Sequence, residues 1–404
     1  MNKVNVGILG ASLVALTTGL SQTTLAADSI SEALSEGTAY GKFRLRYEAV
    51  EQNNILEDAK ALTLRTVLGY KTGSVNGFSA VLQVEDVRSV LGQADFNDKV
   101  NGQTQFSVIA DPESTEIDQG FIQYKNDLLT AKFGTQVFTL DGHRFLGHVG
   151  WRQDWLTFDA ATVVAKPTEG LTVTAGYLYG RNGILADTAD QKSKDVILNA
   201  SYKVGDSGKL VAYSYNLEED DAVAKTNDTF GVSYDGAVKM DSVKILYGAE
   251  YASQTSNTGV VGAADAEPTY TRFELGAVVS GVVVKVMQET LGSDNGVGFA
   301  TPLATLHKWN GWGDQFLATP GQGLVDANVR LISKVGPGKL MVIYHDFSAD
   351  EGVAGADDFG TEFDLDYTVK FGKKYSLGLR YIDYSAEDIK VDTEKLWLSA
   401  NASF

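Results

Sequence analysis

The feature that most constrains this chain is a strict alternation of apolar and polar residues, repeated in one segment after another. In residues 41–48 the polar positions are Lys42, Arg44, Arg46 and Glu48, and the apolar ones are Phe43, Leu45 and Tyr47. Residues 62–70, 78–85, 171–179, 363–371 and 375–381 repeat the pattern. Successive side chains of a strand point to opposite faces. The sequence therefore predicts many strands, each with one apolar and one polar face.

The spacing of these segments predicts how the strands are joined. Strands of roughly ten residues, connected alternately by short turns and long loops, are typical of outer-membrane β-barrels. A bilayer satisfies no backbone hydrogen bonds, so a spanning sheet must close on itself. We therefore predict an all-β fold, a transmembrane antiparallel β-barrel of about 18 strands with short periplasmic turns and long extracellular loops. An even strand number leaves both ends of the barrel on the periplasmic side.

The N-terminal segment has the pattern of a secretory signal peptide. Lys3 precedes an apolar run over residues 6–20, and the small residues Ala26 and Ala27 precede the first acid, Asp28. A charged start, a short apolar run and a small-residue cleavage site are typical of exported proteins. A membrane anchor is the alternative, but this run is short and diluted with glycine and threonine. We predict a signal peptide over residues 1–27 and a single barrel domain over residues 28–404.

Composition excludes several kinds of site. The chain has no cysteine, so it has no disulfide, thiol nucleophile or iron–sulfur cluster. A formal net charge of -18 argues against nucleic-acid binding, which needs a basic surface. His143 and His148 lie in an irregular segment that seldom provides zinc geometry, so we predict neither a metal site nor a cofactor.

A soluble β-sandwich or propeller is the alternative fold. Two features favour the barrel instead: tyrosines occur near the ends of the apolar faces, and the chain ends in an alternating apolar series. That series is Leu396, Leu398, Ala400, Ala402 and Phe404. It resembles the C-terminal assembly signal of bacterial outer-membrane proteins.

Charged residues on the polar faces and in one long loop are the candidate pore lining. A barrel of this size leaves an aqueous channel, whose selectivity depends on inward-folded loops and rings of charge. The loop around residues 139–154 carries Arg144, Trp151 and Arg152, and the loop around residues 292–323 carries Trp309 and Trp312. The predicted pore-lining or substrate-contacting residues are Arg44, Arg46, Glu48, Arg65, Glu85, Lys132, Arg144, Arg152, Asp159, Arg272, Glu274, Arg330 and Arg380. Guanidinium groups stay charged and offer a planar fork to carboxylates.

Other roles for these residues remain open. Arginines and carboxylates in a wide barrel can pair across strands and hold the wall rigid. The loop aromatics Trp151, Trp309 and Trp312 can stack on a sugar ring or anchor their loops inside the barrel. An enzyme would need a serine or carboxylate beside a histidine base, and Asp141 and His143 have no motif such as GxSxG to support them. A non-conducting structural or adhesive barrel is a further alternative.

Several segments resemble one family of porins. They are GKFRLRYE, TLRTVLGYKTG, ADPESTEIDQGFIQY, LDGHRFLGHVGWRQDWLTFDA and TPLATLHKWNGWGDQFLATP. They are similar to the outer-membrane porins of the alginate-export family, most densely over residues 41–161 and 301–320. The resemblance implies an 18-stranded barrel with a charged lumen. The archetype exports an anionic polyuronate through an arginine-rich constriction, and its relatives look like diffusion channels for carbohydrates or small anions.

From these features we predict a porin in the outer membrane of a Gram-negative bacterium. It would let small hydrophilic solutes or oligosaccharides, anionic or carbohydrate in nature, diffuse passively. Export of an alginate-like polysaccharide is the alternative. Its other expected partners are outer-membrane lipid and lipopolysaccharide. Strand parity does not reveal the oligomeric state.

Overall fold

The computed structural model describes residues 27–220, 225–257, 259, 264–352 and 355–404. The predicted signal peptide, residues 1–27, therefore lies outside the described residues except for Ala27. Among the described residues no helix has both the length and the apolarity needed to cross a membrane.

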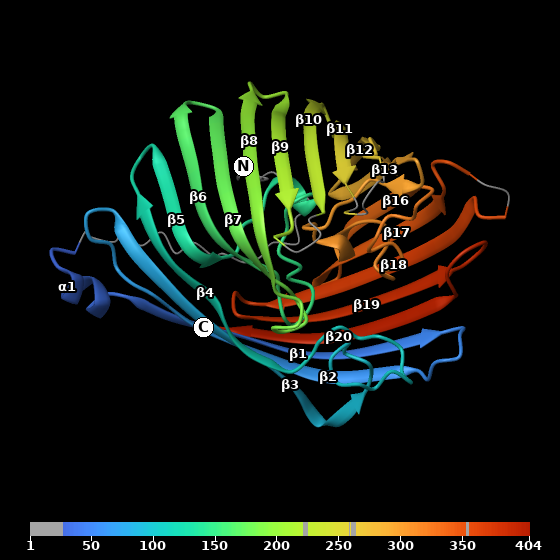
Figure 1. Cartoon of the computed structure of the whole chain (residues 1–404), viewed down its shortest axis with the longest axis horizontal. Helices are drawn as coiled ribbons and strands as arrows, with labels where there is room; N and C mark the ends of the chain where they lie inside the picture. The colour runs from blue at the N-terminus through green and yellow to red at the C-terminus, as the bar shows by residue number, and fades with distance from the viewer. Residues whose placement is uncertain (1–26, 221–224, 258, 260–263, 353–354) are drawn as a thin grey trace.

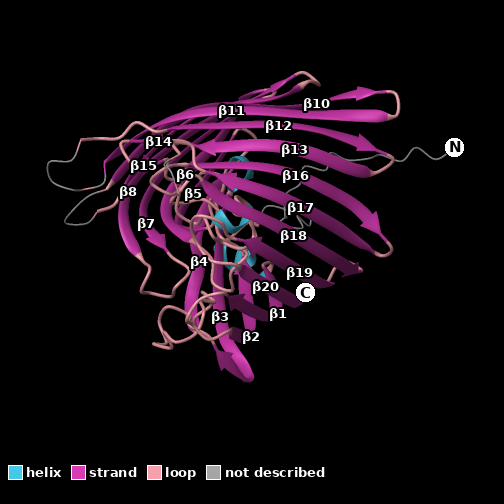
Figure 2. Ribbon diagram, turned by 90° about the vertical axis from the view of Figure 1, so that its right-hand side faces the viewer, coloured by secondary structure: helices cyan, strands magenta, loops and turns pink. Residues whose placement is uncertain are grey.

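Eighteen strands form one sheet that closes on itself (Figures 1 and 2). Each strand pairs antiparallel with the next one along the chain, and β20 (Thr393–Ser403) pairs with β1 (Thr38–Gln52) to complete the wall. The remaining wall strands are β2 (Ala59–Lys71), β3 (Phe78–Asp95), β4 (Ser114–Lys125), β5 (Leu129–Gln136), β6 (Thr157–Thr168), β7 (Leu171–Asn182), β8 (Gln191–Val204), β9 (Gly208–Glu218), β10 (Thr226–Met240), β11 (Val243–Asn257), β12 (Thr269–Val279), β13 (Val282–Leu291), β16 (Leu324–Val335), β17 (Gly338–Ser348), β18 (Asp358–Phe371) and β19 (Tyr375–Ser385). This confirms the predicted closed antiparallel barrel.

Connections alternate between short turns at one end and longer loops at the other. Turns such as 169–170 and 280–281 contrast with the loops 137–156 and 292–323. The larger of these loops contains the two-stranded ribbon β14 (Ser293–Asp294) and β15 (Val297–Gly298). A short helix, α1 (Ile30–Ser35), precedes the barrel, with Ser29 capping it by accepting from the backbone N–H of Glu32.

Both ends of the barrel chain lie at the short-turn end, as an even number of strands requires. The backbone N–H of Ala27 donates to the carbonyl of Ser74, which lies in the turn between β2 and β3. Gly41 and Phe404 exchange two backbone hydrogen bonds where the first and last strands meet.

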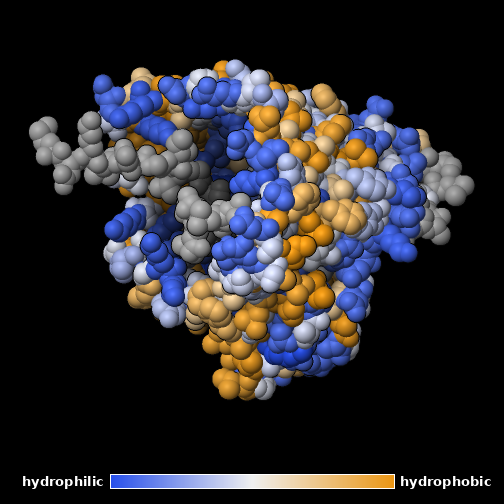
Figure 3. Space-filling view, turned by 90° about the vertical axis from the view of Figure 1, so that its left-hand side faces the viewer, coloured by the Kyte–Doolittle hydropathy of each residue, from blue (hydrophilic) through white to orange (hydrophobic). Residues whose placement is uncertain are grey.

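Apolar side chains of the wall point outward, away from the barrel interior. Leu275 on β12 and Phe133 on β5 are 57% and 62% exposed, although both lie in the middle of a strand. Figure 3 shows hydrophobic residues over much of the outside and hydrophilic residues around a hollow. An outer belt of this kind suits contact with lipid, since it would be unfavourable in water.

The interior also contains an apolar cluster that the sequence pattern did not predict. Phe145 of loop 137–156 packs against Tyr213, Tyr270 and Phe299, with ring centroids 5.2 to 6.0 Å apart. The cluster forms because the large loops fold inward and must bury their own apolar residues against the wall. Part of the inner face is therefore apolar rather than polar.

Candidate constriction

Loops 137–156 and 292–323 meet inside the barrel and contain two one-turn helices, η1 (Asp141–His143) and η2 (Leu306–Lys308). The N–H of Gly147 donates to the carbonyl of Leu303 at 2.7 Å, and the N–H of Thr305 donates to the carbonyl of His143 at 3.0 Å. A Cβ at Gly147 would lie only 2.2 Å from Oγ1 of Thr305, so only glycine allows this approach. The two loops therefore form one inward structure.

Arg44 on β1 faces this structure and contacts only neutral acceptors. Its guanidinium donates to Oε1 of Gln153 at 2.7 Å, to the carbonyl of Gly150 at 3.0 Å and to the carbonyl of Arg152. No carboxylate of the described residues forms an ion pair with it. The loop thus fixes the orientation of Arg44 and leaves its positive charge without a direct counter-ion.

The neighbouring Arg46 and Glu48 on β1 are buried in ion pairs. Arg46 pairs with Asp111 of loop 96–113, and Glu48 accepts from Arg152 at 3.1 Å. Burial alone would raise the pKa of Asp111, but Arg46, Arg152 and the N–H of Gln153 lower it overall. This ion-pair network joins the first strand to two loops.

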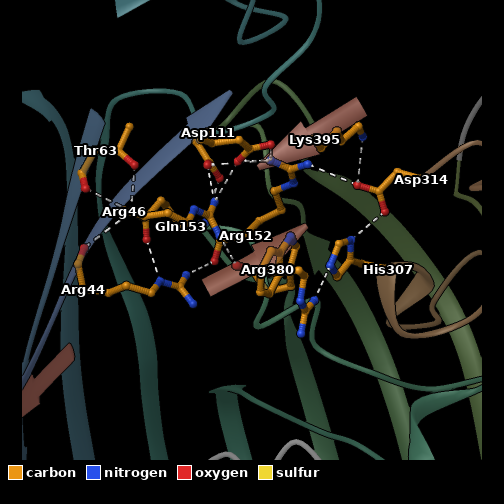
Figure 4. A network of polar contacts seen from close by, with 12 residues as sticks. Arg44, Arg46, Thr63, Asp111, Arg152, Gln153, His307, Asp314, Arg380 and Lys395 are labelled. Carbon is orange, nitrogen blue, oxygen red and sulfur yellow. Dashed lines mark hydrogen bonds and ion pairs between the residues drawn. The ribbon is translucent and has the colours of Figure 1, made fainter. Parts of the chain in front are cut away.

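Asp314 of loop 292–323 connects this network to β20 and β19, the wall strands that follow β1 around the closure of the barrel (Figure 4). It accepts from Arg152 at 3.2 Å and from Nδ1 of His307 at 2.8 Å, and Nζ of Lys395 on β20 lies 3.6 Å away. Nε2 of His307 lies 2.7 Å from Nη1 of Arg380, which can only donate. His307 is therefore neutral with its proton on Nδ1, which agrees with burial lowering its pKa to about 4.

Arg380 on β19 lies between two tryptophans. Its guanidinium carbon is 4.0 Å from the ring centre of Trp151 and 3.9 Å from that of Trp312. Trp151 also stacks on His307, with centroids 4.2 Å apart and an interplanar angle of 7°. Cation–π contacts shielded from water stabilise by about 2 kcal/mol. Trp151 and Trp312 thus anchor the two loops to the wall.

Arg144 forms a second attachment between the loops and the wall. Its Nε lies 2.7 Å from Oε1 of Glu289 on β13, and both side chains are almost completely buried. Glu289 also accepts from the hydroxyl of Tyr270 at 2.6 Å and from Nδ2 of Asn310 at 2.7 Å. Trp309 lies beside this pair, 5.2 Å from the guanidinium carbon of Arg144.

The remaining predicted wall residues fall into two groups. In the first, each charge has a partner of opposite sign: Arg65 with Glu85, Arg272 with Glu250 and Asp235, Glu274 with Lys285, and Arg380 with Asp366. In the second, Lys132 lies over the ring of Phe121 and Arg330 donates to Asn328, and neither forms an ion pair within the described residues. Lys42 and Lys308, which also face the interior, likewise have no ion pair there.

Contrary to the prediction, Asp159 faces away from the lumen. It pairs with Thr135 on the outer side of the wall and accepts from its hydroxyl at 2.6 Å, while the neighbouring Phe158 points inward and is fully buried. The inward apolar cluster includes Phe158, so this stretch of β6 has its apolar face inside. The sequence prediction, which rested on polarity alone, placed Asp159 on the wrong face.

Sequence reasoning missed several residues that hold the constriction. They are Asp111, Gln153, Glu289, Asp314 and Lys395. Their partners are 42 or more residues away in several cases, for example Gln153 with Asp111 and with Thr63. No local pattern marks such pairs.

The residues considered for catalysis and for zinc binding have other neighbours in the structure. Asp141 contacts Asn199 and Lys209 rather than His143. The rings of His143 and His148 lie 5.2 Å apart, and no group of three or more metal-ligating side chains occurs in the part of the chain that the structure describes.

Comparison with solved structures identifies the same architecture in outer-membrane porins of the Occ/Opd group. Acinetobacter baumannii OccAB4 superposes with a TM-score of 0.71 at 14% identity, covering 91% of this chain and 98% of that one. Pseudomonas aeruginosa OpdL gives 0.69 at 15% identity, covering 92% and 99%. Pseudomonas aeruginosa OpdK, in a structure with vanillate, gives 0.71 at 12% identity, with the same coverage as OpdL.

No protein-family model matches the chain, and no curated protein matches its sequence. The comparisons therefore support the porin fold, and they give no support to the alginate-export family in particular.

Proposed function

We propose that this protein is a porin of the Gram-negative outer membrane through which small hydrophilic anions, carboxylates among them, diffuse passively. The proposal rests on one observation above all. At the constriction the guanidinium of Arg44 is held in place by three neutral acceptors, which leaves its charge available to a passing anion. The porin architecture of its structural neighbours supports the passive mechanism, and the neighbour with vanillate, a carboxylate, supports the solute class.

The arginines divide into two functional groups under this proposal. Arg46, Arg144, Arg152 and Arg380 are buried in ion pairs or between tryptophans and hold the loops in the lumen. Arg44, Lys132 and Arg330 have no carboxylate partner among the described residues and provide the field that attracts anions. Cations that no carboxylate neutralises raise the local concentration of anions around them.

One loop carboxylate near the constriction opposes anions less than its formal charge suggests. Burial, together with Glu116 and Glu85, raises the pKa of Asp154 to about 8. Asp154 is therefore mostly protonated at neutral pH, and it repels anions less than an ordinary aspartate would.

Single-channel recording in planar bilayers tests the proposal. Under a potassium chloride gradient the reversal potential of the wild type should indicate anion preference, and oligouronate or a small carboxylate should block the current. Arg44→Ala should weaken block about tenfold, which corresponds to about 1.4 kcal/mol. Because Arg44 also holds loop 137–156, the double variant Lys132→Gln/Arg330→Gln provides a charge-only test.

The matched control is Lys194→Gln, an exposed lysine on the outward face of β8 that also carries Val196, which should leave the selectivity unchanged. Cation preference of the wild type, or unchanged selectivity in both lumen variants, contradicts the anion proposal. Absence of conductance from a folded barrel contradicts the porin proposal and favours a structural or adhesive barrel.

A further inference from the structure

The outer face of the barrel has an apolar groove where the first and last strands meet. It measures about 390 Å³, within the range of 300–1,000 Å³ that is typical of ligand pockets. Its floor is formed by Ala400 and Ala402 of β20. Its walls are formed by Phe43, Leu45, Leu64, Phe371, Tyr375 and Leu377.

The strand register explains why the surface is hollow at this point. Ala400 pairs with Leu45 on one side and Leu377 on the other, and Ala402 pairs with Phe43 and Tyr375. Two small residues thus lie in a row between larger ones, so the outer surface of the barrel is recessed along β20. The groove runs along the strand, as an extended hydrocarbon chain would.

Positive charge lies at the short-turn end of this groove. Phe371 and Tyr375 both line it, and the turn 372–374 between them carries Lys373 and Lys374. Both lysines are exposed, and neither forms an ion pair within the described residues. Adjacent unpaired lysines contrast with the strongly acidic chain, whose formal net charge is -18.

The aromatic residues and lysines at this end of the groove lie at the depth expected of lipid headgroups. Phe371 and Tyr375 are exposed aromatic residues at the ends of their strands, where aromatic belts lie at the level of lipid headgroups. Lysines just beyond such a belt attract anionic headgroups. In the outer membrane the short turns face the periplasm, so the adjacent lipids belong to the inner leaflet.

We infer that this groove is a binding site for an anionic phospholipid of the inner leaflet. A segment of one acyl chain lies over Ala400 and Ala402, and the phosphate is bound by Lys373 and Lys374. The site is on the outside of the wall, so it does not depend on which solute crosses the lumen. By covering the strands where the barrel closes, the lipid would stabilise the join between β20 and β1.

Native mass spectrometry of the full-length mature protein in detergent micelles tests this inference. Phosphatidylglycerol and phosphatidylcholine with identical acyl chains are titrated separately. We expect phosphatidylglycerol to bind on the order of tenfold more tightly, and Lys373→Gln/Lys374→Gln to remove that preference. Ala400→Leu, which fills the groove, should weaken binding of both lipids.

Two controls match these changes elsewhere on the barrel. Lys203→Gln/Lys239→Gln removes two lysines next to other short turns, and Ala277→Leu enlarges an outward alanine on β12. Neither should alter lipid binding. A heat-modifiable gel shift verifies that each variant is folded.

Three results would overturn the inference. The first is equal affinity of the wild type for the two lipids, and the second is an unchanged preference in Lys373→Gln/Lys374→Gln. The third is an oligomer of the wild type that Ala400→Leu dissociates without change in lipid binding, since the groove would then receive a second copy of the chain.

Discussion

At the scale of single residues, the surroundings of an arginine decide what it can do. Arg44 and Arg46 lie two residues apart on the same face of β1. Arg46 is neutralised by Asp111, whereas Arg44 is held by an amide and two carbonyl oxygens. Removing one partner of a buried ion pair costs about 3–5 kcal/mol because it leaves the other charge unpaired. Arg46 is therefore suited to structure, and under the proposed function Arg44 interacts with the solute.

The buried His307 predicts that the constriction loosens in acid. Burial lowers the pKa of His307 to about 4, and the attraction of Asp314 does not offset this effect. The ordinary value is about 6.5, so the released loop binds a proton more readily than the docked one. The free energy that holds loop 292–323 in its docked position is therefore largest above about pH 6.5. It decreases as the pH falls toward 4, by up to about 3 kcal/mol.

Current noise and limited proteolysis of loop 292–323, measured between pH 7 and 4, check this prediction. His307→Gln should flatten part of the pH dependence, because glutamine keeps a donor and an acceptor without titrating. His143 and His148, whose pKa values burial also lowers to about 4, should maintain the remainder. Identical profiles for the wild type and His307→Gln would contradict the assignment.

At the scale of elements, the two inward loops depend on the wall for their conformation. Loop 137–156 is attached through Arg152 to β1 and through Arg144 to β13, and loop 292–323 is attached through Asp314 to β20. Loops without regular structure keep a fixed conformation only when such contacts offset their conformational entropy. The constriction is thus a property of loops and wall together.

Glu289→Gln tests how strongly one of these attachments holds. It leaves the buried Arg144 without its carboxylate, so we expect the docked loops to lose about 3–5 kcal/mol. Glu274→Gln is the matched control, since the Glu274–Lys285 pair joins two wall strands rather than a loop to the wall and should leave the docking of the loops nearly unchanged.

Hydrogen exchange at Gly147 and Thr305, whose N–H groups join the two loops, measures this effect. Exchange should become faster in Glu289→Gln while the strands stay protected. Equal acceleration in both variants would show that the Arg144–Glu289 pair has no special role.

At the scale of the whole molecule, the apolar outer belt and the closed wall both fit a lipid bilayer. Every wall strand that the structure describes pairs on both sides, so these strands leave no unpaired edge that would require a partner. Outward residues such as Leu275 are exposed because lipid rather than protein is expected to cover them.

Leu275→Arg tests that orientation. Leu275 lies mid-strand on the outer face, so an arginine there should destabilise the barrel in a bilayer by about 2–4 kcal/mol. Leu246→Arg on the neighbouring β11 faces the lumen and should cost much less. Urea unfolding in lipid vesicles measures both, and a reversed order of the two variants would contradict the assigned faces.

The barrel itself could be predicted because its signal is local. Side chains of residues 41–48 alternate within one strand, and the same pattern recurs in most other strands. The structure agrees with that pattern over most of the wall. It differs at Asp159 and Phe158, where inward-folded loops reverse which face must be apolar.

The sequence by itself determined the all-β class, the closed barrel, the alternation of turns with loops, and the two loops that would enter the lumen. These follow from a period of two residues and from the requirement that a membrane-spanning sheet leave no unpaired edge. Only the tertiary structure decided which charges neutralise one another and which remain available. Arg152 meets Glu48, Asp111 and Asp314, residues 104, 41 and 162 positions away, and such contacts depend on how the loops pack rather than on any local pattern.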